Sequence, residues 1–236
     1  MCRVATFVVF LSAVSLAQVN TNLDTKATGW QICTTCAGGL NAATSMTATE
    51  TSSAKNGHGL KLHLAGPGYA NALYYRPVGP TSANYFSYDV WFYISTANLA
   101  VSEALEYDFY AYNAPYRFMW GSQCVMGGDW FGWNDNARTW VDLKLPCSIV
   151  AGWNHIQWWG HRDPITTANC SGMPCSYQDT LGVNNVYNAV NLVTPASWLP
   201  SGWGNDSGPQ VQLDQNASGA DVNAIISDVN FAALGQ

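Results

Sequence analysis

The sequence carries little charge. Charged residues make up 10% of its 236 positions, compared with about a quarter in an ordinary soluble domain. The nine Lys and Arg residues are outnumbered by 15 Asp and Glu residues, which gives a formal net charge of −6. Because such a chain has no basic surface to neutralise phosphates, we expect no nucleic-acid partner. Disorder is not expected either, since 48% of the residues are apolar and 13% are aromatic.

The chain also lacks an apolar run long enough to span a membrane, which needs about 20 residues. Its one apolar segment, residues 4–16, follows Arg3 and ends in the small-x-small pattern Ser15-Leu16-Ala17. These features are typical of a secretory signal peptide. We therefore expect residues 1–17 to be a signal peptide, residues 18–236 to form a single domain, and the mature protein to be secreted and extracellular.

The cysteines support an oxidising compartment. Loss of Cys2 with the signal peptide leaves an even number, and close spacing favours local disulfides, which we predict as Cys33–Cys36, Cys124–Cys147 and Cys170–Cys175. The second of these would close a loop that holds Trp130, Trp133 and Trp140. Cys33-Thr-Thr-Cys36 could instead be half of a redox or zinc site, but no second Cys-x-x-Cys follows it. No metal site and no cofactor are expected from the residues themselves.

No stretch shows a helical period over ten or more residues, whereas period-two alternation recurs along the chain. Turn-forming clusters such as Gly66-Pro67-Gly68 separate the alternating stretches. We predict strands at residues 60–65, 72–76, 85–94, 104–112, 117–124, 139–143, 153–162, 187–193, 210–214 and 224–231. The predicted fold is all-β, an antiparallel two-sheet β-sandwich of the jelly-roll type.

Three of these strands have two different faces. Successive side chains point to opposite sides of a sheet, so each strand separates into an apolar side and a mixed side. The apolar sides, which we assign to the core, carry Val90, Phe92, Leu105, Phe109, Ile156 and Trp158. The mixed sides combine rings with carboxyl, amide and imidazole groups, and they carry Asp89, Trp91, Tyr93, Glu106, Asp108, Tyr110, Tyr112, His155, Gln157, Trp159 and His161.

Rings and short polar groups together suit a sugar, because a pyranose has an apolar side for stacking and a hydroxyl rim for hydrogen bonds. The alternative is that loops cover the mixed sides and their rings form a satellite core. Buried rings alone do not require so many polar neighbours, each of which needs a partner. We predict that Asp89, Trp91, Tyr93, Glu106, Tyr110, Tyr112, His155, Gln157, Trp159 and His161 line one concave face that binds a poly- or oligosaccharide.

Six segments in order carry a resemblance: residues 30–39 (WQICTTCAGG), 86–90 (FSYDV), 105–108 (LEYD), 121–124 (GSQC), 153–157 (WNHIQ) and 211–214 (VQLD). Together they resemble a group of secreted acidobacterial proteins of the concanavalin A-like lectin/glucanase superfamily. The resemblance implies a jelly roll whose concave sheet is the saccharide site. It leaves a structural calcium ion open and implies no particular activity.

Glucanases of this superfamily carry Glu-x-Asp-x-Glu or Glu-x-Asp-x-x-Glu on one strand. Glu106 and Asp108 match the first half of this pattern, but Tyr110 and Ala111 occupy the positions of the second glutamate. A carboxyl pair at the ~5–5.5 Å separation of retaining enzymes therefore cannot come from this strand alone. It would need a cross-strand partner such as Asp89.

Three functions stay open. The one we favour is a lectin-like, monomeric carbohydrate-binding protein. The second is a glycoside hydrolase with Glu106 and Asp108 as its catalytic residues, or a polysaccharide lyase that uses these residues or His155 or His161 with a tyrosine. The third is an adhesive or structural surface protein.

Overall fold

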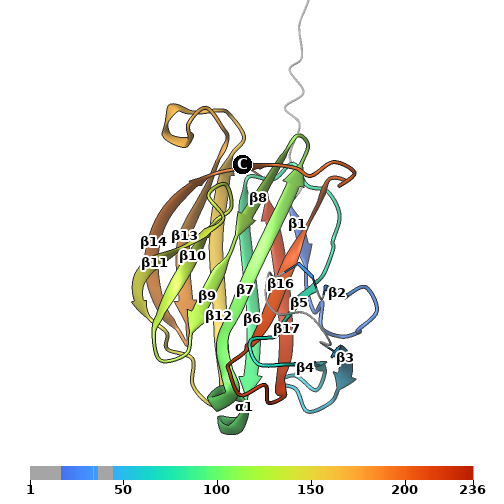
Figure 1. The fold of residues 1–236 in the computed structure, drawn as a ribbon. Coiled ribbons are helices and arrows are strands. Elements are labelled where there is room, and N and C mark those ends of the chain that lie inside the picture. Colours follow the sequence, from blue (N-terminus) through green and yellow to red (C-terminus); the bar gives the residue numbers. More distant parts are fainter. Residues whose placement is uncertain (1–16, 34, 37–44, 236) are drawn as a thin grey trace, which may run out of the picture.

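The computed structural model describes residues 17–33, 35–36 and 45–235, without the side chains of Ser45 and Met46. The expected signal peptide, residues 1–17, lies outside the described residues except for Ala17. The described chain is almost entirely β-structure, folded as two antiparallel sheets that lie face to face (Figure 1). The predicted all-β sandwich is confirmed. No helix within the described ranges is long and apolar enough to cross a membrane.

The first sheet, here called sheet I, has the strand order β14-β13-β12-β6-β17-β4-β3, with β1 added alongside β17. Its strands are β1 (Gln18–Asn20), β3 (Ser45–Thr51), β4 (Gly59–Ala65), β6 (Tyr85–Ile94), β12 (Gly152–Asp163), β13 (Cys175–Val183), β14 (Val186–Pro195) and β17 (Val222–Leu234).

The second sheet, sheet II, has the order β11-β10-β9-β7-β16-β5-β2, with β8 paired to β7 and β15 paired to β8. Its strands are β2 (Gln31–Cys33), β5 (Asn71–Tyr75), β7 (Ser102–Asn113), β8 (Tyr116–Trp120), β9 (Ser122–Val125), β10 (Asp129–Asn134), β11 (Thr139–Pro146), β15 (Ser197–Trp198) and β16 (Asp206–Gln215). The helix α1 (Thr96–Val101) closes one end of the sandwich between β6 and β7 (Figure 1), and the short 3-10 turn η1 (Ala168–Cys170) precedes β13.

The core lies between the inner faces of the two sheets. Phe92 on β6, Phe109 on β7 and Trp158 on β12 are all fully buried in it, as the alternation predicts. Trp159, next in sequence to Trp158, points to the other side of its strand and is half-buried. Alternation along each strand therefore fixes which side chains face the core.

All three predicted disulfides are present. Cys33 is bonded to Cys36, Cys124 to Cys147 and Cys170 to Cys175. Cys124 lies on β9 and Cys147 directly follows β11, so their bond ties down both ends of the β10–β11 hairpin. The disulfides are consistent with a secreted protein.

Several elements differ from the predicted ones. The predicted strand at residues 117–124 is two strands, β8 and β9, which are separated at Gly121. A Cβ at this position would lie 2.7 Å from the Cβ of Trp133, so only glycine allows this close approach. The Trp-rich segment is not a loop but the β10–β11 hairpin, and Trp130 belongs to the core while Trp133 and Trp140 point outward.

Candidate functional site

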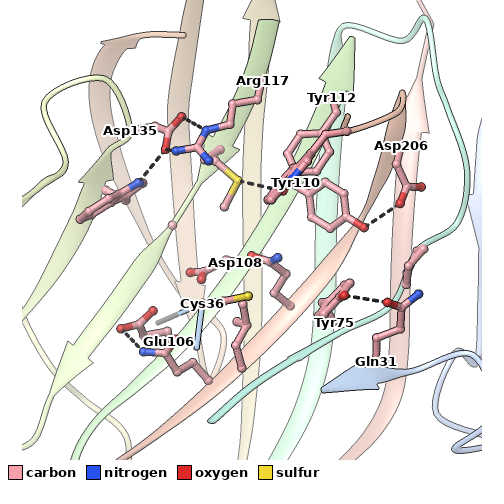
Figure 2. Close-up of a pocket in the computed structure, with 18 of the residues that line it drawn as sticks. Gln31, Cys36, Tyr75, Glu106, Asp108, Tyr110, Tyr112, Arg117, Asp135 and Asp206 are labelled. Carbon is pink, nitrogen blue, oxygen red and sulfur yellow. Dashed lines mark hydrogen bonds and ion pairs between the residues drawn. The ribbon is translucent and has the colours of Figure 1, made fainter. Parts of the chain in front are cut away.

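A groove of about 600 Å³ crosses the outer face of sheet II (Figure 2). It runs across the strand direction, from Trp140 on β11 to Gln31 on β2. The side chains that line it are mainly aromatic, amide and carboxyl groups: Gln31, Leu73, Tyr75, Glu106, Asp108, Tyr110, Tyr112, Arg117, Met119, Trp133, Asp135, Trp140, Trp203, Asn205, Asp206, Gln210 and Gln212. Cys36, Pro77, Gly121 and Gly204 complete the lining.

The floor of the groove is built by β7, β16 and β5, which are neighbours in sheet II. Glu106 on β7 is paired in register with Gln212 on β16 and with Gln123 on β9. Both amides donate to Oε1 of Glu106, over 2.8 Å from Gln212 and 2.9 Å from Gln123. Gln212 also donates to Oδ1 of Asp214 over 2.9 Å. Neutral amides, not cations, therefore hold Glu106 on the floor and the neighbouring Asp214.

The surroundings of these carboxyls favour their protonated forms. Burial raises the pKa of Glu106 well above its ordinary value, and the neighbouring Asp214 and Asp108 raise it further. Burial also raises the pKa of Asp108 to about 8, although the backbone N–H of Ser122, which donates to Oδ1 over 2.9 Å, lowers it. The pKa of Asp214 is raised by burial to about 7. At mildly acidic pH these three groups hold protons and act as hydrogen-bond donors.

Aromatic rings rise on both sides of this floor. On one side, Trp133 of β10 and Trp140 of β11 lie with their ring centroids 5.0 Å apart. On the other side, Tyr112 of β7 lies 4.5 Å from the ring of Tyr110 and 5.3 Å from that of Trp203. The groove thus combines rings on its walls with hydrogen-bonding groups on its floor.

An ion pair fixes one wall. Arg117 on β8 donates from Nη2 to Oδ1 of Asp135 over 2.6 Å and from Nε to Oδ2 over 2.8 Å (Figure 2). The indole Nε1 of Trp133 donates to the same Oδ1 over 3.1 Å. Asp135 is only 2% exposed, so this bidentate pair is sheltered from solvent and orients both the guanidinium and the indole.

The prediction that all the mixed strand sides form one face is wrong. Strand β7 belongs to sheet II, whereas β6 and β12 belong to sheet I, so their outer faces lie on opposite sides of the sandwich. Glu106, Asp108, Tyr110 and Tyr112 line the groove. The others share the outer face of sheet I: Asp89, Trp91, Tyr93, His155, Gln157, Trp159 and His161. A catalytic pair of Glu106 with Asp89 is excluded for the same reason.

On the outer face of sheet I, most rings already stack on one another. The ring of Trp91 is parallel to that of His155, with centroids 4.4 Å apart, and Nζ of Lys55 lies 3.0 Å from its centroid. The ammonium of Lys55 cannot fit between two rings at that spacing, so it covers the face of the Trp91 indole that is turned away from His155. His161 lies on β12 between Tyr177 on β13 and Tyr85 on β6, and it stacks on both.

The polar groups of that face are paired with each other as well. His155 and Gln157 both bind the carboxyl of Asp89, over 3.0 Å and 2.8 Å, and His161 is paired with Asp179 over 2.7 Å. Neither His155 nor His161 is among the described residues that line the groove, so a histidine-based lyase site does not form there. The geometry favours the groove over the outer face of sheet I as a ligand site.

Most residues that line the groove are not among the predicted site residues, including Trp133 and Trp140 of the first aromatic wall. Trp203 lies in the segment before β16, and Asp206 is the first residue of that strand. The ion pair of Arg117 with Asp135 joins β8 to the turn between β10 and β11. The alternation of Gln210, Gln212 and Asp214 with Val211 and Leu213 was the available signal for β16 as part of the floor. Within the described part of the chain, no group of three or more His, Cys, Asp or Glu side chains is arranged to hold a metal ion.

Comparison with known proteins shows the fold alone. No family model and no curated protein matches this chain. Among solved structures, an alginate lyase from a Chlorella virus matches with a TM-score of 0.54 and 8% identity, over 87% of this chain and 93% of that one. The cellulose-induced protein Cip1 matches with a TM-score of 0.51 and 10% identity, over 89% and 94%. Arcelin-5, a lectin-like defence protein from Phaseolus vulgaris, matches with a TM-score of 0.51 and 10% identity, over 93% and 99%. These likenesses support the two-sheet β-sandwich fold predicted above.

Proposed function

We propose that this chain is a secreted carbohydrate-binding protein and that the groove of sheet II holds a poly- or oligosaccharide. One observation carries the proposal. The rings of Trp133 and Trp140 on one side, and of Tyr112 and Trp203 on the other, flank a floor of amide and carboxyl groups. The rings offer flat surfaces for the apolar sides of sugar rings, and the floor offers directional partners for hydroxyls.

The dimensions of the groove favour a chain of sugars over a single ring. Seven strands lie side by side from β11 to β2, and six spacings of about 4.8 Å give a path of roughly 29 Å across them. Lining residues occur at both ends of this path, with Trp140 at one end and Gln31 at the other. A glycan that lies across the strands would contact both aromatic walls.

A screen of the mature chain, residues 18–236, tests this proposal. Retention in affinity gels that contain plant or microbial polysaccharides is measured together with reducing-end and 235 nm product release. Retention of the native protein, and its loss in Trp140→Ala, are expected. Trp198→Ala serves as the control, because Trp198 is 64% exposed and lies outside the groove. Absence of retention by every polysaccharide contradicts the proposal.

Hydrolysis is a second candidate function, favoured by the proton-holding carboxyls on the groove floor. In this candidate Glu106 donates its proton to the glycosidic oxygen as the bond to the anomeric carbon breaks. Water attacks that carbon, and Asp108 in its ionised form accepts the proton that the water loses. Because the pKa of Asp108 is about 8, activity would increase as the pH approaches that value.

Glu106→Gln distinguishes the two candidates, since it keeps the shape of the side chain and removes its acidic proton. If the native protein releases reducing ends, this variant should lose that activity and retain binding. Asp179→Asn is the control, because it removes a carboxyl from sheet I, away from the groove. Activity that survives Glu106→Gln undiminished contradicts the hydrolytic assignment.

A further inference from the structure

The groove has only one cation among its described lining residues. Four carboxyl side chains are among its described lining residues, those of Glu106, Asp108, Asp135 and Asp206, but only one cation, the guanidinium of Arg117. The undescribed residues 34 and 37–44 contain no Lys or Arg, so they cannot supply a second cation. The carboxylate or sulfate of an acidic sugar is bound most strongly by a free cation, and Arg117 is the one candidate among the described lining residues.

Arg117 is not free to bind a ligand. Both of its hydrogen bonds to Asp135 are short, and their fork geometry uses two of the donors that a bound carboxylate or sulfate would need. Asp135 is almost completely buried, so removing Arg117 from it would leave an unpaired buried charge. The structure therefore assigns the cation of the groove to an internal role.

We propose that the groove takes an uncharged glycan and rejects polysaccharides that carry carboxylate or sulfate groups. This inference rests on the proposed function and adds the chemical class of the ligand. The physical reason is that an anionic group loses its hydration on entering the groove and meets no free cation in return. Hydroxyl groups face no such penalty, because amides, tyrosine hydroxyls and carboxyls can all pair with them. Rejection thus follows from the absence of a free cation and from the carboxyl of Asp206, because Glu106 and Asp108 hold protons at mildly acidic pH and Asp135 is paired with Arg117.

Asp206 lies on the side of the groove formed by Tyr110, Tyr112 and Trp203, and its carboxyl adds to the exclusion of anionic glycans. Its carboxyl accepts hydrogen bonds from the hydroxyl of Tyr110 over 3.1 Å and from the backbone N–H of Gly79 over 3.0 Å. These partners are neutral, so they do not cancel its charge. An extended glycan would pass the Arg117–Asp135 pair and Asp206 along the same groove (Figure 2).

Pairs of polymers that share a backbone and differ in charge test this inference. The probes are hydroxyethylcellulose with carboxymethylcellulose, highly methyl-esterified pectin with polygalacturonate, and laminarin with sulfated laminarin, each in affinity gels at pH 6 and low salt. We expect the uncharged member of whichever pair is bound to retain the native protein at least 10-fold more strongly. Added salt at 0.5 M should narrow the difference, because it screens the repulsion.

The outcomes separate this inference from the proposed function. Equal or stronger retention by a charged member overturns the inference and leaves carbohydrate binding intact. Retention by none of the polymers, in these pairs or in the wider screen, overturns both.

A variant tests the role of the ion pair. Asp135→Asn removes the counter-charge of Arg117 and should increase retention by the charged member several-fold, whereas Asp179→Asn, on sheet I, should not. A folded Asp135→Asn protein that still excludes the charged member to the native extent contradicts the role given to the pair. If Asp135→Asn does not fold, the retention of the native protein by the charged and uncharged polymers tests the inference on its own.

Discussion

Glu106 and Gln212 face each other across the two central strands of sheet II, and Nε2 of Gln212 donates to Oε1 of Glu106 over 2.8 Å. The same amide nitrogen reaches Oδ1 of Asp214, so one neutral side chain connects two carboxyls on neighbouring strands. Because this partner is a neutral amide and not Lys or Arg, no cation stabilises the ionised forms of the two carboxyls, and they keep their protons. The groove floor is therefore a set of hydrogen-bonding groups with little charge at mildly acidic pH.

The stability of the fold should decrease as the pH rises. The pKa of Asp108 is about 8 in the folded protein, against an ordinary value of 3.8. Between pH 3.8 and pH 8, the folded state therefore holds a proton on Asp108 that the unfolded state has lost. The free energy of unfolding therefore falls with pH across this window, and the stabilising contribution is complete only below about pH 4. Asp214, with a pKa of about 7, acts in the same direction.

Asp108→Asn should flatten that dependence. Asparagine keeps an oxygen that accepts from the N–H of Ser122, but it cannot ionise. We expect the melting temperature of the variant to exceed that of the native protein at pH 8–9 and to differ little near pH 4. A native melting temperature that rises steadily from pH 5 to pH 8 contradicts the protonated state assigned to the floor.

Two adjacent tryptophans should differ in their effect on folding. Trp158 is fully buried, so Trp158→Ala should lower the free energy of unfolding by about 3–5 kcal/mol. Trp159 lies on the outer face of sheet I and contacts the ring of Tyr187, so Trp159→Ala should cost about 1 kcal/mol. Urea denaturation of the two variants measures the difference, and a larger loss for Trp159→Ala would place the wrong side of β12 in the core.

The Cys124–Cys147 disulfide should support both the fold and the groove. It closes a separation of 23 residues, which corresponds to about 3 kcal/mol in the chain-entropy model, and it anchors the hairpin that carries Trp133 and Trp140. Replacing both cysteines by alanine should lower the free energy of unfolding by about that amount and weaken glycan retention.

The matched control is the double alanine replacement of Cys170 and Cys175, whose disulfide closes a separation of only five residues and lies outside the groove. This replacement should cost less stability and leave glycan retention unchanged. Thiol titration of the unfolded, unreduced native protein should find no free thiols in the mature chain. Six reactive thiols would show that the disulfides do not form.

The sequence predicts the faces of single strands better than it predicts how strands are grouped. Alternation assigns Val90, Phe109 and Trp158 to the core correctly, because the period of two is a local property of the backbone. Which sheet a strand joins depends on pairings between distant segments. Glu106 and Asp89 therefore look equivalent in the sequence but lie on opposite sides of the sandwich.

Two strands that were not predicted from the sequence, β10 and β13, depend on contacts between the two sheets. β10 follows the turn signal Gly127-Gly128 and contains Gly132, where a Cβ would lie 2.6 Å from both Gln178 and Leu192. β13 carries the polar residues Gln178 and Thr180 around a register shift, and Gln178 is buried because its amide donates to the backbone oxygen of Trp133. Such tertiary contacts leave no periodic signal, so the aromatic wall of the groove could not be placed from the sequence.

We expect the ligand to lie in the groove of sheet II and not on the outer face of sheet I. Trp133→Ala and Trp159→Ala test it side by side, because each removes one half-buried indole from one of the two faces. By analogy with bases stacked on aromatic platforms, loss of a stacking ring costs about 1–3 kcal/mol, or roughly 5- to 150-fold in affinity. In affinity electrophoresis with the best retained polysaccharide, Trp133→Ala should lose retention by that factor while Trp159→Ala keeps it. Loss of retention in Trp159→Ala, with Trp133→Ala unaffected, would contradict a site in the groove and place it on the outer face of sheet I.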